Sequence, residues 1–103
     1  MKVKAETLEV AMMNQASAES ALVAAVLNRS IMRHSLKEAH RVQAATAGEK
    51  ITEGRLDDKA VSDSQYAAKC QAEVEATLAV GETKAKVTRA KCEYEIAVML
   101  ESK

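Results

Sequence analysis

The chain has 103 residues, the length of one domain, and its 15 Lys and Arg balance its 15 Asp and Glu. It contains no Pro, Phe or Trp, only 3 Gly and 2 Tyr, and much alanine, so the composition favours helix and argues against a strand-rich fold. Because the formal net charge is zero, the molecule as a whole exerts no field that would attract nucleic acid or an anionic membrane. We expect one all-α domain over residues 1–103.

The N-terminal segment and the two cysteines bear on the cellular location of the protein. MKVKAETLEV lacks the apolar run and the cleavage site of a signal peptide, and the longest apolar run, Ala21 to Leu27, is too short to span a bilayer. Cys70 and Cys92 have no CxxC spacing and would lie about 33 Å apart on one helix, which predicts free thiols. We therefore expect a cytoplasmic protein, although leaderless secretion would leave no mark in the sequence.

Residues 3–47 are predicted to form a first helical arm. Its apolar stripe changes side at Asn28 to Ser30, so either the helix breaks there or one continuous helix passes from one partner to another. Over the same arm four cations follow one another at a spacing of four residues: Arg29, Arg33, Lys37 and Arg41. This basic stripe could follow the phosphates of a nucleic acid. We favour a solvated face whose cations pair with acidic residues of the second arm, Arg29 with Glu73 and Arg41 with Asp63.

A turn is predicted over residues 48–55, where the apolar periodicity lapses. Gly48 can end the first helix in a left-handed conformation, and Asp57 or Asp58 can cap the next helix. Two arms of equal length about a short turn predict an antiparallel helical hairpin, similar to a coiled coil. The alternative is a single-chain four-helix bundle, with breaks at Asn28 to Ser30 and at Gly81.

The second arm, residues 56–101, has apolar residues on two faces. One face has a mean spacing close to 3.6 and is rich in small residues, and we expect it to form the inner seam of the hairpin, with Val74, Leu78, Ala85 and Ile96. The other carries a line at seven-residue spacing that ends beside Val98, and its predicted outer contacts are Val80, Val87, Tyr94 and Val98. A hairpin buries only one face of each helix, so the second face predicts self-association into a larger helical bundle.

No residue pattern in the sequence predicts an active site. His34 and His40 lie about 240° apart around a helix, and no phosphate-binding loop or nucleophile motif is present, so we expect no catalysis, metal, cofactor or small-molecule substrate. The predicted function is a non-enzymatic structural or assembly protein that forms a closed oligomer or a filament. The alternatives are a small adaptor or chaperone-like regulator that binds a partner's helix, and a nucleic-acid-binding module that uses Arg29 to Arg41.

Overall fold

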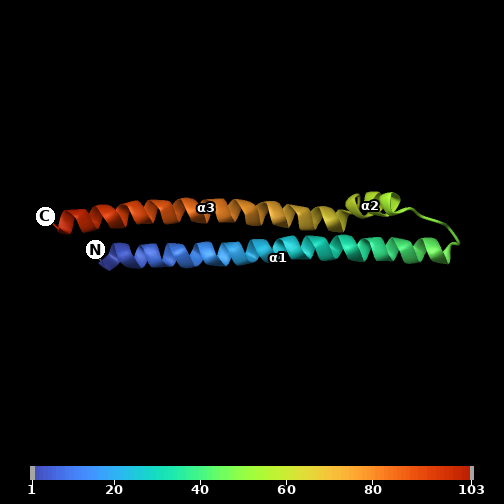
Figure 1. Cartoon of the computed structure of the whole chain (residues 1–103), viewed down its shortest axis with the longest axis horizontal. Helices are drawn as coiled ribbons and strands as arrows, with labels where there is room; N and C mark the ends of the chain where they lie inside the picture. Colours follow the sequence, from blue (N-terminus) through green and yellow to red (C-terminus); the bar gives the residue numbers. More distant parts are fainter. Residues whose placement is uncertain (1, 103) are drawn as a thin grey trace. The chain divides into compact units, whose positions relative to one another are not determined.

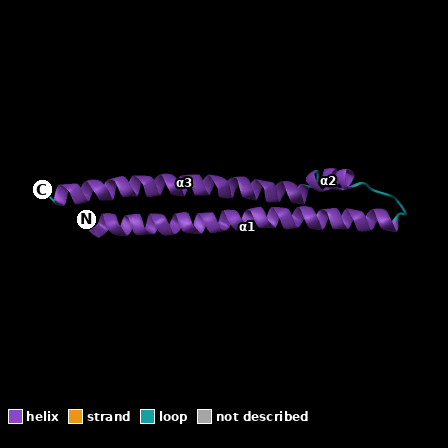
Figure 2. Cartoon of the chain, in the orientation of Figure 1, coloured by secondary structure: helices purple, strands orange, loops and turns teal. Residues whose placement is uncertain are grey.

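A computed structural model describes residues 2–102 and contains three α-helices: α1 spans Lys2–Thr46, α2 spans Glu53–Val61 and α3 spans Ser64–Glu101 (Figure 1). No strand occurs between residues 2 and 102 (Figure 2). The predicted all-α class is therefore confirmed. The turn is shorter than the predicted 48–55, because helix resumes at Glu53.

The only interruption within the predicted arms lies at the start of the second one. α1 continues through Asn28 to Ser30, and α3 continues through Gly81, so the two breaks that a four-helix bundle requires are absent from these helices. Instead α2 ends at Val61, and the carboxylate of Asp63 accepts a hydrogen bond of 2.7 Å from the backbone amide of Gln65. Asp63 thereby caps a new helix, which the sequence analysis did not predict.

The turn between α1 and α2 depends on one glycine. Gly48 has a φ of 72°, and the amide of Glu49 donates to the carbonyl of Ala44 at 2.8 Å, an arrangement that satisfies the last carbonyls of α1. The predicted left-handed cap at Gly48 is confirmed. The predicted cap at Asp57 or Asp58 is wrong, because α2 begins earlier and Thr52 accepts a hydrogen bond from the amide of Arg55 at 3.3 Å.

Two compact units share the long helices. Unit 1 combines α1 up to Leu22 with α3 from Glu75 onward, and unit 2 comprises Val23–Val74. In unit 1 the start of α1 lies beside the C-terminal part of α3, where Lys4 contacts Glu93 at 3.3 Å. Unit 2 contains the turn, α2 and the adjoining ends of α1 and α3. Each unit is thus an antiparallel pairing of helical segments.

The less exposed residues of both long helices include a series that recurs at alternating steps of three and four. On α1 these are Leu8, Ala11, Gln15, Ala18, Leu22, Ala25, Arg29, Met32 and Leu36, and on α3 they are Tyr66, Lys69, Glu73, Ala76, Val80, Thr83, Val87, Ala90, Tyr94 and Ala97. The mean spacing is 3.5, the repeat at which two helices keep the same sides together. Alanine or threonine occupies every second position over most of both series, so the core is thin.

Candidate functional site

On α3 the face predicted to lie inside is exposed, and the face predicted to lie outside is largely buried or half-buried. Of the predicted inner seam, Ala85 is exposed, as are Val74, Leu78 and Ile96, at 52%, 63% and 57%. Of the predicted outer contacts, Val80 is buried, Val87 and Tyr94 are half-buried, and Val98 alone is exposed. The assignment of inner and outer faces was therefore wrong. The line at seven-residue spacing is the less exposed of the two faces, and its Tyr66 and Val80 are buried.

This exchange leaves an uncharged face of α3 without a partner inside the chain. We call it the outer stripe, and its members are Val74, Leu78, Gly81, Ala85, Thr88, Cys92, Ile96 and Met99. A Cβ atom placed on Gly81 would meet no other atom within 4 Å. At Gly81, Ala85 and Cys92 the side chains are small, whereas Val74, Leu78, Ile96 and Met99 are exposed large apolar side chains.

A long segment of α1 that contains a single charged residue is the second exposed surface. Between Val10 and Leu27 the only charged residue is Glu19. Six large apolar side chains of this segment are exposed: Val10, Met12, Met13, Val23, Val26 and Leu27. By length and composition α1 is the one helix of the described range that could cross a membrane, and 6% of its most apolar stretch is buried. Helices that are apolar on all sides normally pack against other helices or lipid.

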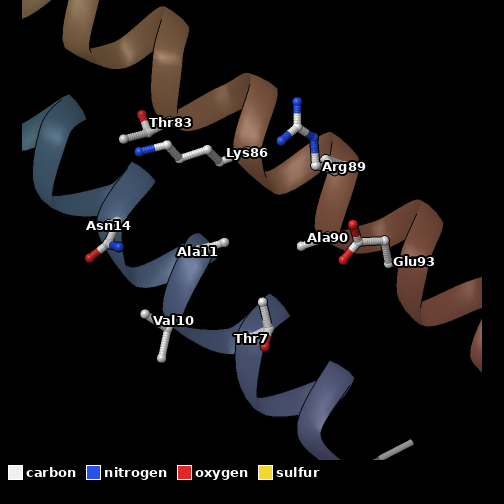
Figure 3. A pocket seen from close by; sticks show the side chains of 9 residues that line it. All are labelled: Thr7, Val10, Ala11, Asn14, Thr83, Lys86, Arg89, Ala90 and Glu93. Carbon is white, nitrogen blue, oxygen red and sulfur yellow. The ribbon is translucent and has the colours of Figure 1, made fainter.

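Unit 1 contains two grooves beside its paired segments of α1 and α3. One has a volume of about 290 Å³, and Figure 3 shows Ala11 of α1 and Ala90 of α3 pointing toward each other between its walls. Its rim is polar and includes Lys86 and Glu93. The other groove, of about 490 Å³, is mainly apolar and is lined by Ala5, Leu8, Glu9, Met12, Met13, Ala16 and Tyr94. Small residues at the centre of the helix pair leave these grooves open.

The predicted basic stripe lies in unit 2, where acidic residues neutralise it. Arg33 contacts Asp57 at 3.0 Å, and Lys37 contacts both Glu53 and Asp57 at 3.1 Å. Arg41 pairs with Glu53 at 2.7 Å and also with Glu38. The fourth cation, Arg29, pairs with Glu73 and donates to the Tyr66 hydroxyl at 3.3 Å. We call these residues the ion-pair cluster.

One predicted pair of the cluster is confirmed and one is wrong. Arg29 pairs with Glu73 as expected. Arg41 pairs with Glu53 and not with Asp63, whose carboxylate accepts a hydrogen bond from the amide of Gln65 at the start of α3.

The charges of the cluster reinforce one another. The ammonium of Lys37, followed by the neighbouring guanidinium groups, holds the pKa of Glu53 and of Asp57 below their ordinary values. Asp57 and then Glu53 raise the pKa of Lys37, and the hydrogen bond to Tyr66 and the carboxylate of Glu73 raise that of Arg29. These shifts favour the charged forms of Glu53, Asp57, Lys37 and Arg29, and each of the four cations lies beside a carboxylate.

The described residues provide no metal site and no disulfide. Within residues 2–102 no group of three His, Cys, Asp or Glu side chains could hold a metal ion. Cys70 and Cys92 are free thiols, as predicted, but Cys92 is exposed on the outer stripe. Comparison with family models, with curated proteins and with solved structures found no match for this sequence. A functional assignment must therefore rest on the surfaces described above.

Proposed function

We propose that this chain is a non-enzymatic structural or assembly protein, a cytoplasmic helical hairpin resembling a coiled coil that associates with copies of itself into a larger helical bundle. The observation that carries the proposal is the segment of α1 from Val10 to Leu27, which contains a single charged residue and exposes apolar side chains on several sides. A helix of this composition is stable in water when other helices cover it.

The balance of buried and exposed apolar residues supports the same proposal. Within residues 2–102 only six hydrophobic residues are buried, and four of them are alanine or valine. Sixteen large hydrophobic residues are exposed, and they lie on all three helices. Association would bury much of this apolar area and add the core that each unit lacks.

Sedimentation velocity of the full chain over a concentration series tests the proposal. We expect a mass of several chains, reduced by the double substitution Met13→Lys and Leu27→Lys, because both side chains are exposed and their replacement charges the apolar segment. Helicity by circular dichroism should be retained. The control is Gln43→Lys, an exposed position of α1 beyond this segment, which should leave the mass unchanged.

A monomer at every concentration would contradict the proposal. Flotation of the chain with phosphatidylcholine vesicles, lost in the double variant, would instead assign the apolar segment of α1 to a membrane, the other environment that such a helix suits.

The apolar groove of unit 1 favours a second candidate, an adaptor or chaperone-like regulator. Its Met12, Met13 and Tyr94 provide the adaptable lining that amphipathic partner helices require. This candidate predicts a monomer or small dimer whose unfolding temperature rises when the partner helix is added. The nucleic-acid alternative gains no support, since the four cations of the basic stripe already contact carboxylates.

A further inference from the structure

We infer that the smaller groove of unit 1, of about 290 Å³, binds the carboxylate and the alkyl chain of a short fatty acid such as octanoate. The inference goes beyond the proposed self-association, because every residue that it uses lies within unit 1 of a single chain. It assigns a class of ligand to a surface that the proposed function leaves unused.

The middle of the groove is apolar and small. Ala11 of α1 and Ala90 of α3 point toward each other there, and Val10 follows Ala11 on its edge (Figure 3). Along α1 the lining extends from Thr7 to Asn14, which is two helical turns or roughly 10 Å. The volume of about 290 Å³ is close to the lower limit of ligand sites in proteins, about 300 Å³, so the occupant is a small molecule.

Three hydrogen-bond donors of the lining have no hydrogen bond or ion pair within residues 2–102: the ammonium of Lys86, the guanidinium of Arg89 and the side-chain amide of Asn14. The two cations extend from α3, and Asn14 lies on α1 (Figure 3). The hydroxyls of Thr7 and Thr83, by contrast, already donate to backbone carbonyls of their own helices at 2.9 Å. The groove therefore offers its unused donors on both helices.

The charge of the lining favours an anion. The one carboxylate among the described lining residues, Glu93, pairs with Lys4 at 3.3 Å, so it does not neutralise Lys86 and Arg89. A carboxylate can accept hydrogen bonds from ammonium, guanidinium and amide groups, and bonds of this kind to charged groups are stronger than those between neutral groups.

Together the two features select an anion that carries an alkyl chain. An inorganic anion or acetate would meet the cations but leave the apolar middle of the groove in water. An alcohol with the same chain would cover Ala11 and Ala90 but leave Lys86 and Arg89 without a counterion. A short fatty acid does both, and burying its chain adds the hydrophobic contribution that exposed ion pairs lack.

Titration of octanoate into the full chain, followed by calorimetry and amide NMR, tests the inference. We expect saturable shifts of the amide signals of Ala11 and Ala90. Lys86→Gln with Arg89→Gln should weaken binding at least tenfold, because both cations beside the carboxylate are lost. The matched control is Lys84→Gln with Lys91→Gln, which removes the same charge from exposed positions of α3 outside the lining and should change the affinity less than twofold. Equal losses in the two double variants would overturn the inference.

A series of ligands separates the two contributions. Octanol, which lacks the charge, and acetate, which lacks the chain, should each bind at least tenfold more weakly than octanoate. Hexanoate should lie between acetate and octanoate, with at most about a fourfold change in affinity for each methylene group. Octanol that binds as tightly as octanoate, or octanoate that shows no saturable binding, would overturn the inference. Sedimentation of the same samples measures self-association separately, so none of these failures would contradict the proposed function.

Discussion

The two units use the same long helices but are stabilised by different interactions. Unit 2 contains Leu56, the one large side chain of the described range that is fully buried, and the ion-pair cluster. Unit 1 has a thinner interior, in which Val80 and Ala90 are buried, and much of its α1 segment is uncharged. Charges thus hold the pairing of unit 2 in a defined register. Exposed apolar surface is present in both units, at Val10, Met12 and Met13 in unit 1 and at Val23, Val26 and Leu27 in unit 2.

The largest effect should come from removing the core of unit 2. Leu56→Ala is expected to cost about 2–5 kcal/mol of unfolding free energy, because it leaves a cavity where the side chain is 1% exposed. Urea unfolding followed by circular dichroism measures the loss. Val61→Ala on the same helix is the control, and its side chain is 50% exposed, so a change within about 0.5 kcal/mol is expected. Equal losses would show that α2 does not pack as described.

Truncating a side chain on either face of α3 in unit 1 should cost less unfolding free energy than Leu56→Ala, and the cost should differ between the two faces. Val80→Ala removes two buried methyl groups and should cost about 1.5 kcal/mol. Leu78→Ala, two positions away and exposed, should leave the unfolding of dilute protein almost unchanged and weaken association instead. Urea titrations at two protein concentrations measure both. If Leu78→Ala lost more unfolding free energy than Val80→Ala in dilute protein, the inner face would be the one first predicted from the sequence.

The smallest effect should be the pH dependence of unit 2. The depressed pKa values of Glu53 and Asp57 mean that both carboxylates contribute to stability above their ordinary values of 4.5 and 3.8, and that this contribution is lost as the pH falls through the lower folded values. The urea concentration at the unfolding midpoint should therefore decrease when the pH is lowered below 4.5. Glu53→Gln with Asp57→Asn should flatten this part of the profile, whereas Glu6→Gln should not.

Lys37 determines the alkaline part of the same profile of stability against pH. Its pKa is raised above 10.5, so its contribution is present below pH 10.5 and is lost as the pH rises beyond the folded value. A profile that is flat at both ends in the parent chain would mean that the ion-pair cluster adds nothing to folding.

Local signals in the sequence predicted the helices well. The absence of Pro predicts two long helices, Gly48 predicts where the first ends, and the four-residue spacing of the cations predicts one face. The Arg29–Glu73 pair followed from placing two arms about the turn. The partner of Arg41 was misassigned because the second arm is interrupted between α2 and α3, so the two arms do not pair about one centre: Arg29 and Glu73 are centred on residue 51, and Arg41 and Glu53 on residue 47.

The packing faces of α3 were harder to predict because both are apolar. A straight helix has 3.6 residues per turn, which favours the small-residue face, whereas two paired helices favour a spacing of 3.5, which selects Tyr66, Val80, Val87 and Tyr94. Over this length the two periods diverge, and a single sequence does not reveal which one the partner helix follows. The cap at Asp63 was missed because it lies inside an otherwise regular pattern.

The alternating steps of three and four along α1 and α3 restrict how the length of this protein can change. One added residue turns everything beyond it by about 100°, which would bring the outer surface of a helix to the inside. Seven added residues make almost two full turns and keep each side chain on its side. In unit 1 the facing helix must grow by the same amount to retain its partners. A change of length that keeps the packing of unit 1 therefore requires paired insertions of seven residues, one in each helix.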